Sequence, residues 1–245
     1  MIYPLLWLVA SSFKSNDTMF KNTYSLFAST AGYSFGHFFM NSAIVTVIGV
    51  VCTIFFSLLA TYAVSRVKFF GANFWFGCII MTMMIPAQVM VVPQYIILKK
   101  LHLNDTLLAM ILPWAFGGAF FVFLIVQYMR GIPKELDEAA MIDGCSKIGI
   151  LFKILVPVVQ PAIVSAAIFA FYWIWQDFFL PLIFVGSPKN YTIPLALNMY
   201  TDPNSCNNYG GLFAMSVISL LPVILVFIKF QKYLVEGIAT DGIKG

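Results

Sequence analysis

The segment that decides the fold runs from Arg130 to Lys153 and reads RGIPKELDEAAMIDGCSKIGILFK. It holds eight of the 24 charged side chains in this chain of 245 residues. Long uncharged stretches flank it on both sides. Because burying so many charges in lipid would cost more free energy than the flanking stretches gain, the segment must lie outside a bilayer. Its density of helix-forming residues predicts a docking surface.

The remainder of the chain has the composition of a membrane protein. Hydrophobic residues make up 61% of the chain and charged residues 10%, whereas a soluble domain carries about 25% charged residues. Five uncharged runs each exceed the roughly 20 apolar residues that cross a hydrocarbon core as a helix. These predicted spans are residues 38–65, 69–98, 106–129, 154–176 and 203–228.

The N-terminal stretch from Met1 to Phe13 is apolar, but its 13 residues make only roughly 20 Å of helix. It lacks the basic leader and cleavage site of a secretory signal. It is either a re-entrant or interfacial segment, or the outer end of a sixth span whose beginning is missing; we favour the second. We therefore predict an all-α, polytopic membrane protein. One transmembrane domain would cover residues 1–245, with six transmembrane helices of which the first is truncated.

The distribution of Lys and Arg predicts the orientation of the spans. With the polar segment inside, nine basic residues face the inner side and five face the outer side. Cytoplasmic loops carry the excess of basic residues, so we expect the polar segment and the C-terminus in the cytoplasm. The net charge of +4 then reflects topology. Because basic residues never cluster beyond adjacent pairs, a nucleic-acid surface is not indicated.

Several motifs of catalysis and metal binding are missing from the sequence. The four cysteines are scattered without a CxxC pair, which argues against a metal site or a disulfide framework. No GxxxxGK(S/T) phosphate loop occurs, so ATP hydrolysis would have to come from another chain. The sequence contains no HExxH motif, so a membrane hydrolase of that type is not indicated. No cofactor is implied.

The polar segment has the pattern of two short helices joined by a turn. Pro133 suits a first helical turn, and the acidic residues after it favour a helix N-terminus. Gly144 permits a sharp turn, and an amphipathic stretch from Ile148 to Leu155 follows. We expect Pro157 to begin the next span.

The same segment carries a family resemblance. Three features resemble the EAA loop of ABC importer permeases: Glu138-Ala139-Ala140, then Gly144 four positions later, then Ile154 and Pro157. The surrounding IPKELDEAAMIDG is similar to the carbohydrate-uptake branch of that family. The similarity covers essentially the whole chain through Asn41-Ser42, Met84-Ile85-Pro86, Tyr191-Thr192-Ile193-Pro194 and the ending Lys232 to Ile238. The departures are small: Cys145 replaces the usual Ala, Val156 the usual Leu, and Gln176 stands where a Trp-Asn pair is common.

The resemblance implies a permease subunit in the bacterial cytoplasmic membrane, without catalytic chemistry of its own. It implies four kinds of partner: a second homologous permease chain, two ATP-binding subunits, an extracytoplasmic solute-binding protein and membrane lipid. The solute would be a sugar or sugar derivative, moved by alternating access. The coupling loop, residues 130–156, would dock into a cleft of the ATPase, with Glu138 facing a basic residue there. The implied ATPase-coupling residues are Glu138, Ala139, Ala140, Asp143, Gly144, Ile154 and Pro157.

Polar and aromatic side chains within or beside the spans are candidates for the transport path. The candidates are Trp175, Gln176, Asp177, Gln88 and Asn41. Asp177 lies about 30 Å along a helix from Pro157, which places it near the outer interface. An aromatic belt and interhelical hydrogen bonds explain the same residue types and remain open alternatives.

Two further features concern the predicted outer side. Asn104, Asp105 and Thr106 are candidates to cap the fourth span. The stretch from Gly186 to Gly210 is rich in Pro, Asn, Tyr and Gly, which predicts turns and a surface for a soluble partner.

Two other classes of function compete with the permease. A stand-alone channel or secondary transporter would need selectivity elements or an ion relay within the spans. An integral membrane enzyme would need a cluster of His, Asp or Glu at the water boundary. The spans offer one interfacial acid, Asp177, and no such cluster. ATP dependence of uptake separates the permease from the channel.

Overall fold

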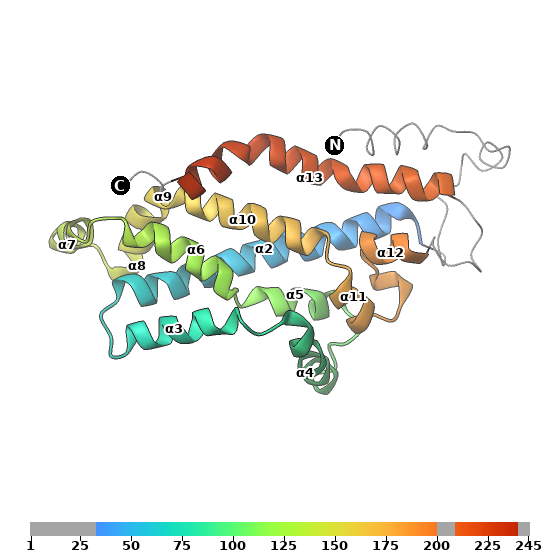
Figure 1. The fold of residues 1–245 in the computed structure, drawn as a ribbon, viewed down its shortest axis with the longest axis horizontal. Coiled ribbons are helices and arrows are strands. Elements are labelled where there is room, and N and C mark those ends of the chain that lie inside the picture. The colour runs from blue at the N-terminus through green and yellow to red at the C-terminus, as the bar shows by residue number, and fades with distance from the viewer. Residues whose placement is uncertain (1–32, 200–208, 240–245) are drawn as a thin grey trace. The chain divides into compact units, whose positions relative to one another are not determined.

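The computed structural model describes residues 33–199 and 209–239, the latter with side chains from 212 to 233. The predicted truncated span at Met1–Phe13 lies outside these residues. Every regular element of the described part is helical (Figure 1). The elements are α2 (Phe35–Arg66), α3 (Ala72–Thr82), α4 (Ala87–Lys100), α5 (Leu107–Ala115), α6 (Ala119–Arg130), α7 (Glu135–Ile142), α8 (Lys147–Gly149), the π-helical turn η2 (Ile150–Leu155), α9 (Val156–Val158), α10 (Gln160–Trp175), α11 (Phe179–Phe184), the 3-10 turn η3 (Pro188–Asn190), α12 (Ile193–Met199) and α13 (Tyr209–Ala239).

Three helical stretches in the described part are long and apolar enough to cross a membrane: Phe35–Arg66, Leu107–Arg130 and Leu212–Tyr233. They correspond to three of the predicted spans. Two strongly bent helix pairs raise the number to five if each pair is one span. The all-α membrane class is therefore confirmed. The predicted count of six is not reached by the described residues.

The predicted span over residues 69–98 is broken. Helices α3 and α4 meet at an angle of 97°, with Met83 to Pro86 between them. Proline disfavours helical geometry in the residue before it and lacks the N–H that a continuing helix needs. Helix α3 ends at Thr82, and Pro86 immediately precedes α4, its carbonyl accepting from the Val89 N–H at 3.0 Å. The sequence predicts one span here; the structure has a full change of direction.

The predicted span over residues 154–176 is also bent. Lys147–Val158 and Gln160–Trp175 meet at 81°, with Val159 at the break. Pro161 has no N–H to donate to the carbonyl of Pro157, so the helical ladder is interrupted there. The expected start of the straight span at Pro157 is therefore wrong by one turn, because α10 begins at Gln160.

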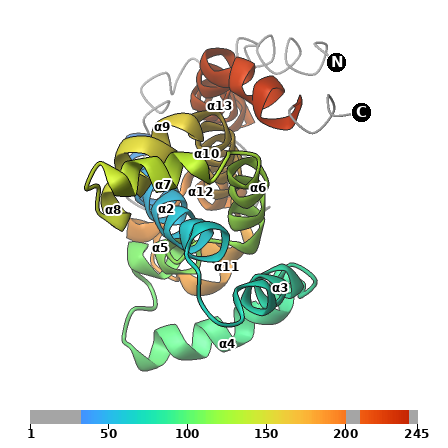
Figure 2. The ribbon, with the colours of Figure 1, turned by 90° about the vertical axis from the view of Figure 1, so that its left-hand side faces the viewer.

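The chain folds into two compact units that alternate along the sequence. Among the described residues, unit 1 comprises 33–47, 95–111, 172–199 and 209–227, and unit 2 comprises 48–94, 112–171 and 228–239. The coupling loop lies in unit 2, where α7, α8 and α9 each contact η2. The labels of these three helices lie close together in Figures 1 and 2.

Within unit 2, α2 packs through a row of small hydroxyl residues. Thr53 donates to the Trp114 carbonyl at 2.6 Å, and Thr61 donates to the Val122 carbonyl at 3.3 Å. Ser57, between them, is fully buried. Small side chains let membrane helices approach closely, and the Thr53 and Thr61 hydroxyls donate to carbonyls that lipid cannot satisfy. This row holds α2 against α5 and α6.

Candidate functional site

The coupling loop has the expected form of a short helix, a turn and a second helix. Helix α7 ends at Ile142, and Gly144 follows with φ +80°. The second helix begins after Ser146, whose hydroxyl accepts from the Gly149 N–H at 3.1 Å. Only the N-terminal boundary differs from the expectation. Lys134 precedes the first helical residue, so Pro133 lies just outside the helix.

Most of the sequence-predicted coupling residues are exposed. Glu138, Ala139, Asp143 and Gly144 are exposed, as is Pro157; Ile154 is half-buried and Ala140 is buried. Since Ala140 faces the protein, the acidic and small residues around it are left at the surface. They are accessible to a partner protein.

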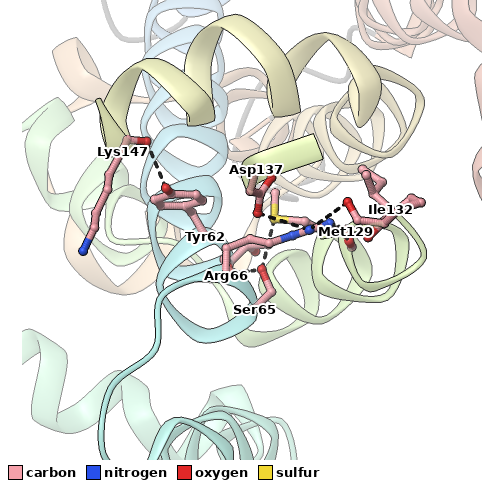
Figure 3. Close-up of polar contacts among 9 residues, drawn as sticks. Tyr62, Ser65, Arg66, Met129, Ile132, Asp137 and Lys147 are labelled. Atoms are coloured by element: carbon pink, nitrogen blue, oxygen red, sulfur yellow. Dashed lines mark hydrogen bonds and ion pairs between the residues drawn. The ribbon is translucent and has the colours of Figure 1, made fainter. Parts of the chain in front are cut away.

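Arg66, the last residue of α2, fastens the coupling loop to the rest of unit 2 (Figure 3). Its Nη2 donates to the Met129 carbonyl at 2.6 Å and to the Ile132 carbonyl at 2.9 Å. Its Nη1 lies 3.2 Å from Asp137 Oδ2 in α7 and 3.5 Å from the Pro133 carbonyl. One guanidinium thus joins three parts of the chain: the end of α2, the end of α6 and the first turn of α7.

The Arg66–Asp137 ion pair is shielded from water. The Arg66 side chain is 2% exposed and the Asp137 side chain 15% exposed. A guanidinium presents its donors in a planar fork, so it can satisfy several acceptors at once. Buried charges are tolerated only when paired and hydrogen-bonded, and Arg66 meets both conditions. We call Arg66, Asp137 and the carbonyls of Met129, Ile132 and Pro133 the Arg66 clamp.

A second hydrogen bond connects α2 to α8, the other helix of the coupling loop. The Tyr62 hydroxyl, one turn before Arg66, donates to the Lys147 carbonyl in α8 at 2.9 Å, as Figure 3 shows. Ser65 donates to the Met129 sulfur at 3.0 Å. The last turn of α2 therefore contacts both helices of the coupling loop and the end of α6. A movement of the loop must move α2 or break these bonds.

In unit 1, the Asn41-Ser42 motif of the family resemblance lies in contact with the motif that begins at Tyr191. Asn41 Nδ2 donates to the carbonyls of Lys189 and Tyr191 at 2.9 and 3.0 Å. Ser42 accepts from the Ile193 N–H at 2.8 Å. The first turns of α2 therefore hold the segment that leads into α12.

Asp105 organises the same end of unit 1. Its carboxylate accepts from the backbone N–H groups of Gly186 and Ser187 at 3.0 and 2.8 Å, and from the Ser187 hydroxyl. Asn190 donates to the Asp105 carbonyl at 2.5 Å. The expected capping role of Asp105 is wrong, because the carboxylate is occupied by residues 186 and 187.

These contacts also set the pKa of Asp105. Burial by itself would raise the pKa of the carboxyl. The hydrogen bonds from Ser187, Gly186 and Asn190 outweigh that effect and hold the pKa below its usual value. Hydrogen bonding to the charged form favours that form. Asp105 is therefore an anchoring carboxylate that stays ionised at neutral pH.

The sequence matches one protein family over most of its length: residues 53–240 match the "Binding-protein-dependent transport system inner membrane component" family. The chain belongs to this family. The probable ABC transporter permease protein YurM of Bacillus subtilis (strain 168) is 38% identical over 252 residues, covering 99% of this chain and 84% of that protein. The arabinooligosaccharides transport system permease protein AraQ of Halalkalibacterium halodurans is 34% identical over 257 residues, covering 100% and 91%.

A solved structure has the same fold. It is a bacterial ABC transporter involved in the import of the acidic polysaccharide alginate, with a TM-score of 0.81 and 22% identity over 95% of this chain and 90% of that chain. The present protein is therefore a membrane-embedded permease of a binding-protein-dependent ABC importer. The resemblance of the sequence to the family of ABC importer permeases is confirmed.

The permease places its transport-path candidates in different settings. In unit 1, Trp175 is buried and its Nε1 donates to the Ser219 carbonyl at 3.1 Å. Asp177 accepts from the N–H groups of Phe179 and Leu180 at 3.0 and 3.2 Å, which caps α11. Asn41 is buried and holds the 189–191 backbone. Gln176 is exposed in unit 1, and Gln88 is exposed in unit 2.

Two residues of this permease were not foreseen from sequence. Arg66 was counted only as an inner basic residue, although it follows an uncharged run of 28 residues, 38–65. Sequence alone makes Asp105 a candidate cap of the fourth span. The role of each residue is visible only from a bonded partner that is distant in the sequence. Asp137 lies 71 positions from Arg66, and Gly186 lies 81 positions from Asp105. No group of three or more potential metal ligands occurs in the described residues.

Proposed function

We propose that this permease imports a sugar or sugar derivative, which a soluble binding protein delivers on the outer side of the membrane. The relative AraQ is named for arabinooligosaccharide transport, which supports a carbohydrate solute. The polar segment and the C-terminus lie in the cytoplasm, as the excess of basic residues on that side favours. A second homologous permease chain and two ATP-binding subunits complete the importer.

The coupling loop docks into the ATPase subunit and carries its motion into the spans. The observation that carries this proposal is the Arg66 clamp, because it ties the exposed loop to the ends of α2 and α6 through a buried charge. A loop that only joined two helices would need no such attachment. When ATP closes the ATPase subunits, displacement of α7 is passed to α2 by the Arg66–Asp137 pair.

Each coupling residue has a role that follows from its position. Glu138 is exposed on α7 and pairs with a basic residue of the ATPase. Ala139 leaves room for close approach, while Ala140 packs inward. Asp143 and Gly144 form the turn, and Gly144 φ of +80° is a conformation that glycine adopts without strain. Ile154 and Pro157 lead from the loop into the bent span.

For the transport path, the exposed amides are the stronger candidates. Gln176 and Gln88 present amide groups at the surface of their units, and amides can both donate to and accept from sugar hydroxyls. Asn41, Trp175 and Asp177 have structural hydrogen bonds in this state. They shape the path rather than contact the solute.

The docking proposal is tested with Glu138→Gln in the assembled importer reconstituted in proteoliposomes. We expect ATP-driven uptake of labelled oligosaccharide to fall by about tenfold or more, by loss of a charge-assisted contact. Glu135→Gln, which removes a second exposed charge of α7, is the matched control and should retain uptake. Unchanged uptake in Glu138→Gln would refute the role of this residue. Equal losses in both variants would indicate a general charge effect.

A further inference from the structure

A cavity of about 780 Å³ opens beside the Arg66 clamp within unit 2. Its walls come from the end of α2, the turn that leads into α3, and the connection between α6 and α7. Basic side chains line it: Arg66, Lys68, Arg130 and Lys134. Asn73 adds an amide, and no Asp or Glu belongs to the lining. A volume of this size lies within the usual range of small-molecule sites, roughly 300–1,000 Å³.

Three of the four cations are available to a ligand. Arg66 is neutralised by Asp137 and buried. Lys68, Arg130 and Lys134 are exposed, and none forms an ion pair with another described residue. The Arg130 guanidinium also stacks on the Phe76 ring at 4.5 Å, which holds it in place. The cavity therefore has three uncompensated positive charges, one from the turn after α2 and two from the end of α6 and the connection to α7.

Exposed aromatic rings lie in the cavity wall and in the first turn of α3, which follows it in the chain. Phe69 and Phe70 belong to its lining and are 41% and 102% exposed. Phe74 and Trp75 in the first turn of α3 are exposed as well. Aromatic rings favour the headgroup level of a membrane, and Arg66 ends a helix long enough to span it. The cavity thus lies at the depth of one membrane interface.

We propose that this cavity binds the phosphate headgroup of an anionic phospholipid. Lys68, Lys134 and the Arg130 fork hold the phosphate oxygens, Asn73 donates to the headgroup, and the acyl chains leave along the exposed rings of α3. Basic pockets at the cytoplasmic ends of spanning helices suit such headgroups, because the inner leaflet is negatively charged. The bound lipid would rest against the connection that Arg66 holds.

The test is lipid binding to the purified, delipidated importer in neutral detergent, measured by native mass spectrometry. Phosphatidylglycerol and phosphatidylcholine with identical acyl chains are titrated separately. We expect phosphatidylglycerol to bind at least about tenfold more tightly, because each basic side chain near an anionic surface contributes roughly fivefold. Equal binding of the two lipids by the unmodified importer would overturn the proposal without any variant.

The site is located with the double variant Lys68→Gln/Lys134→Gln. It should lose about twentyfold in phosphatidylglycerol affinity and keep its phosphatidylcholine affinity. The control is Lys99→Gln/Lys100→Gln, which removes two exposed charges at the end of α4, outside the cavity lining. An equal loss in the control, or no loss in the cavity variant, would contradict this location.

Two further measurements distinguish the possible sources of the anion. Inorganic phosphate at millimolar concentration should not displace the lipid; full displacement would identify a site for free phosphate. Binding to the permease chain alone, but not to the complete importer, would show that a partner's acidic surface covers the cavity, and would refute the lipid site. These results do not depend on uptake, so they stand apart from the test of the coupling loop.

Discussion

At the residue scale, Arg66 shows how a charge can end a membrane helix without facing water. Four acceptors surround its guanidinium, and only 2% of the side chain is exposed. A lysine offers a single point of attachment and could not reproduce the planar fork. We therefore expect Arg66 to be hard to replace by any single residue.

The buried pair predicts a specific pattern of stability. Arg66→Met leaves the Asp137 carboxylate buried without its partner, which costs roughly 3–5 kcal/mol. Replacing both charges, as Arg66→Met with Asp137→Leu, should recover part of that loss, because no buried charge remains. Thermal unfolding of the detergent-solubilised protein measures both variants. A double variant less stable than the single one would contradict this account of the pair.

Gly117 is the second residue-scale prediction. Its φ is +80°, and an added Cβ would lie 2.8 Å from Ser57 Oγ and 3.1 Å from Ser57 N. Gly117→Ala combines backbone strain with a clash in the row where α2 meets α5 and α6, and should cost roughly 1–3 kcal/mol. Gly77→Ala in α3 is the matched control, since its Cβ meets nothing within 4 Å. Thermal unfolding measures the stability of both variants. If Gly117→Ala loses no more stability than Gly77→Ala, then Ser57 leaves room for the added methyl group and the expected clash is absent.

At the element scale, the turn between α7 and α8 depends on one glycine. Gly144 has φ +80°, but open space surrounds the position of its Cβ. Gly144→Ala therefore strains the backbone without a clash, and should cost roughly 1–2 kcal/mol. Because the strain acts on the turn, we expect reduced uptake per ATP hydrolysed in the reconstituted importer. Gly77→Ala serves again as control, and an unchanged uptake ratio in Gly144→Ala would show that the turn tolerates a side chain.

The segment from Gly186 to Asn190 gives a pH-dependent prediction. The folded pKa of Asp105 is depressed, so its hydrogen bonds stabilise the segment fully above the unfolded pKa of about 3.9. This stabilisation is lost as pH falls through the lower, folded pKa. Hydrogen-exchange protection of the Gly186 and Ser187 amides should therefore persist at pH 5 to 8 and fall in acid.

The Gly149 amide is the internal reference for this experiment. It donates to the Ser146 hydroxyl, which does not titrate in acid. Its protection should change less than that of Gly186 and Ser187 as the pH falls. A parallel loss at all three amides would indicate general acid unfolding and would contradict a local effect of Asp105.

At the scale of the whole molecule, the proposed function as a permease subunit predicts that sugar uptake requires ATP hydrolysis in a partner chain. Proteoliposomes that contain the complete importer with a catalytically inactive ATPase should accumulate no labelled oligosaccharide. The same preparation with active ATPase should accumulate it in the presence of the binding protein. Downhill flux of equal rate without hydrolysis would favour a channel.

The sequence by itself determined the membrane class, three of the span positions, the helix–turn–helix form of the coupling loop and the family. These properties follow from local composition: uncharged runs longer than a bilayer, a charged segment that lipid excludes, and a glycine at fixed spacing from an acidic helix. Each depends on residues that are close together along the chain.

Only the tertiary structure decided which polar groups pair and how sharply two spans bend. Arg66 and Asp137 are 71 positions apart, and Asp105 binds groups more than 80 positions away. Pro86 and Pro161 lie at the two bends, but the angles of 97° and 81° depend on how neighbouring segments pack. A charge that sequence alone assigns to water is buried because carbonyls and a carboxylate from distant segments surround it, and such surroundings exist only in the folded chain.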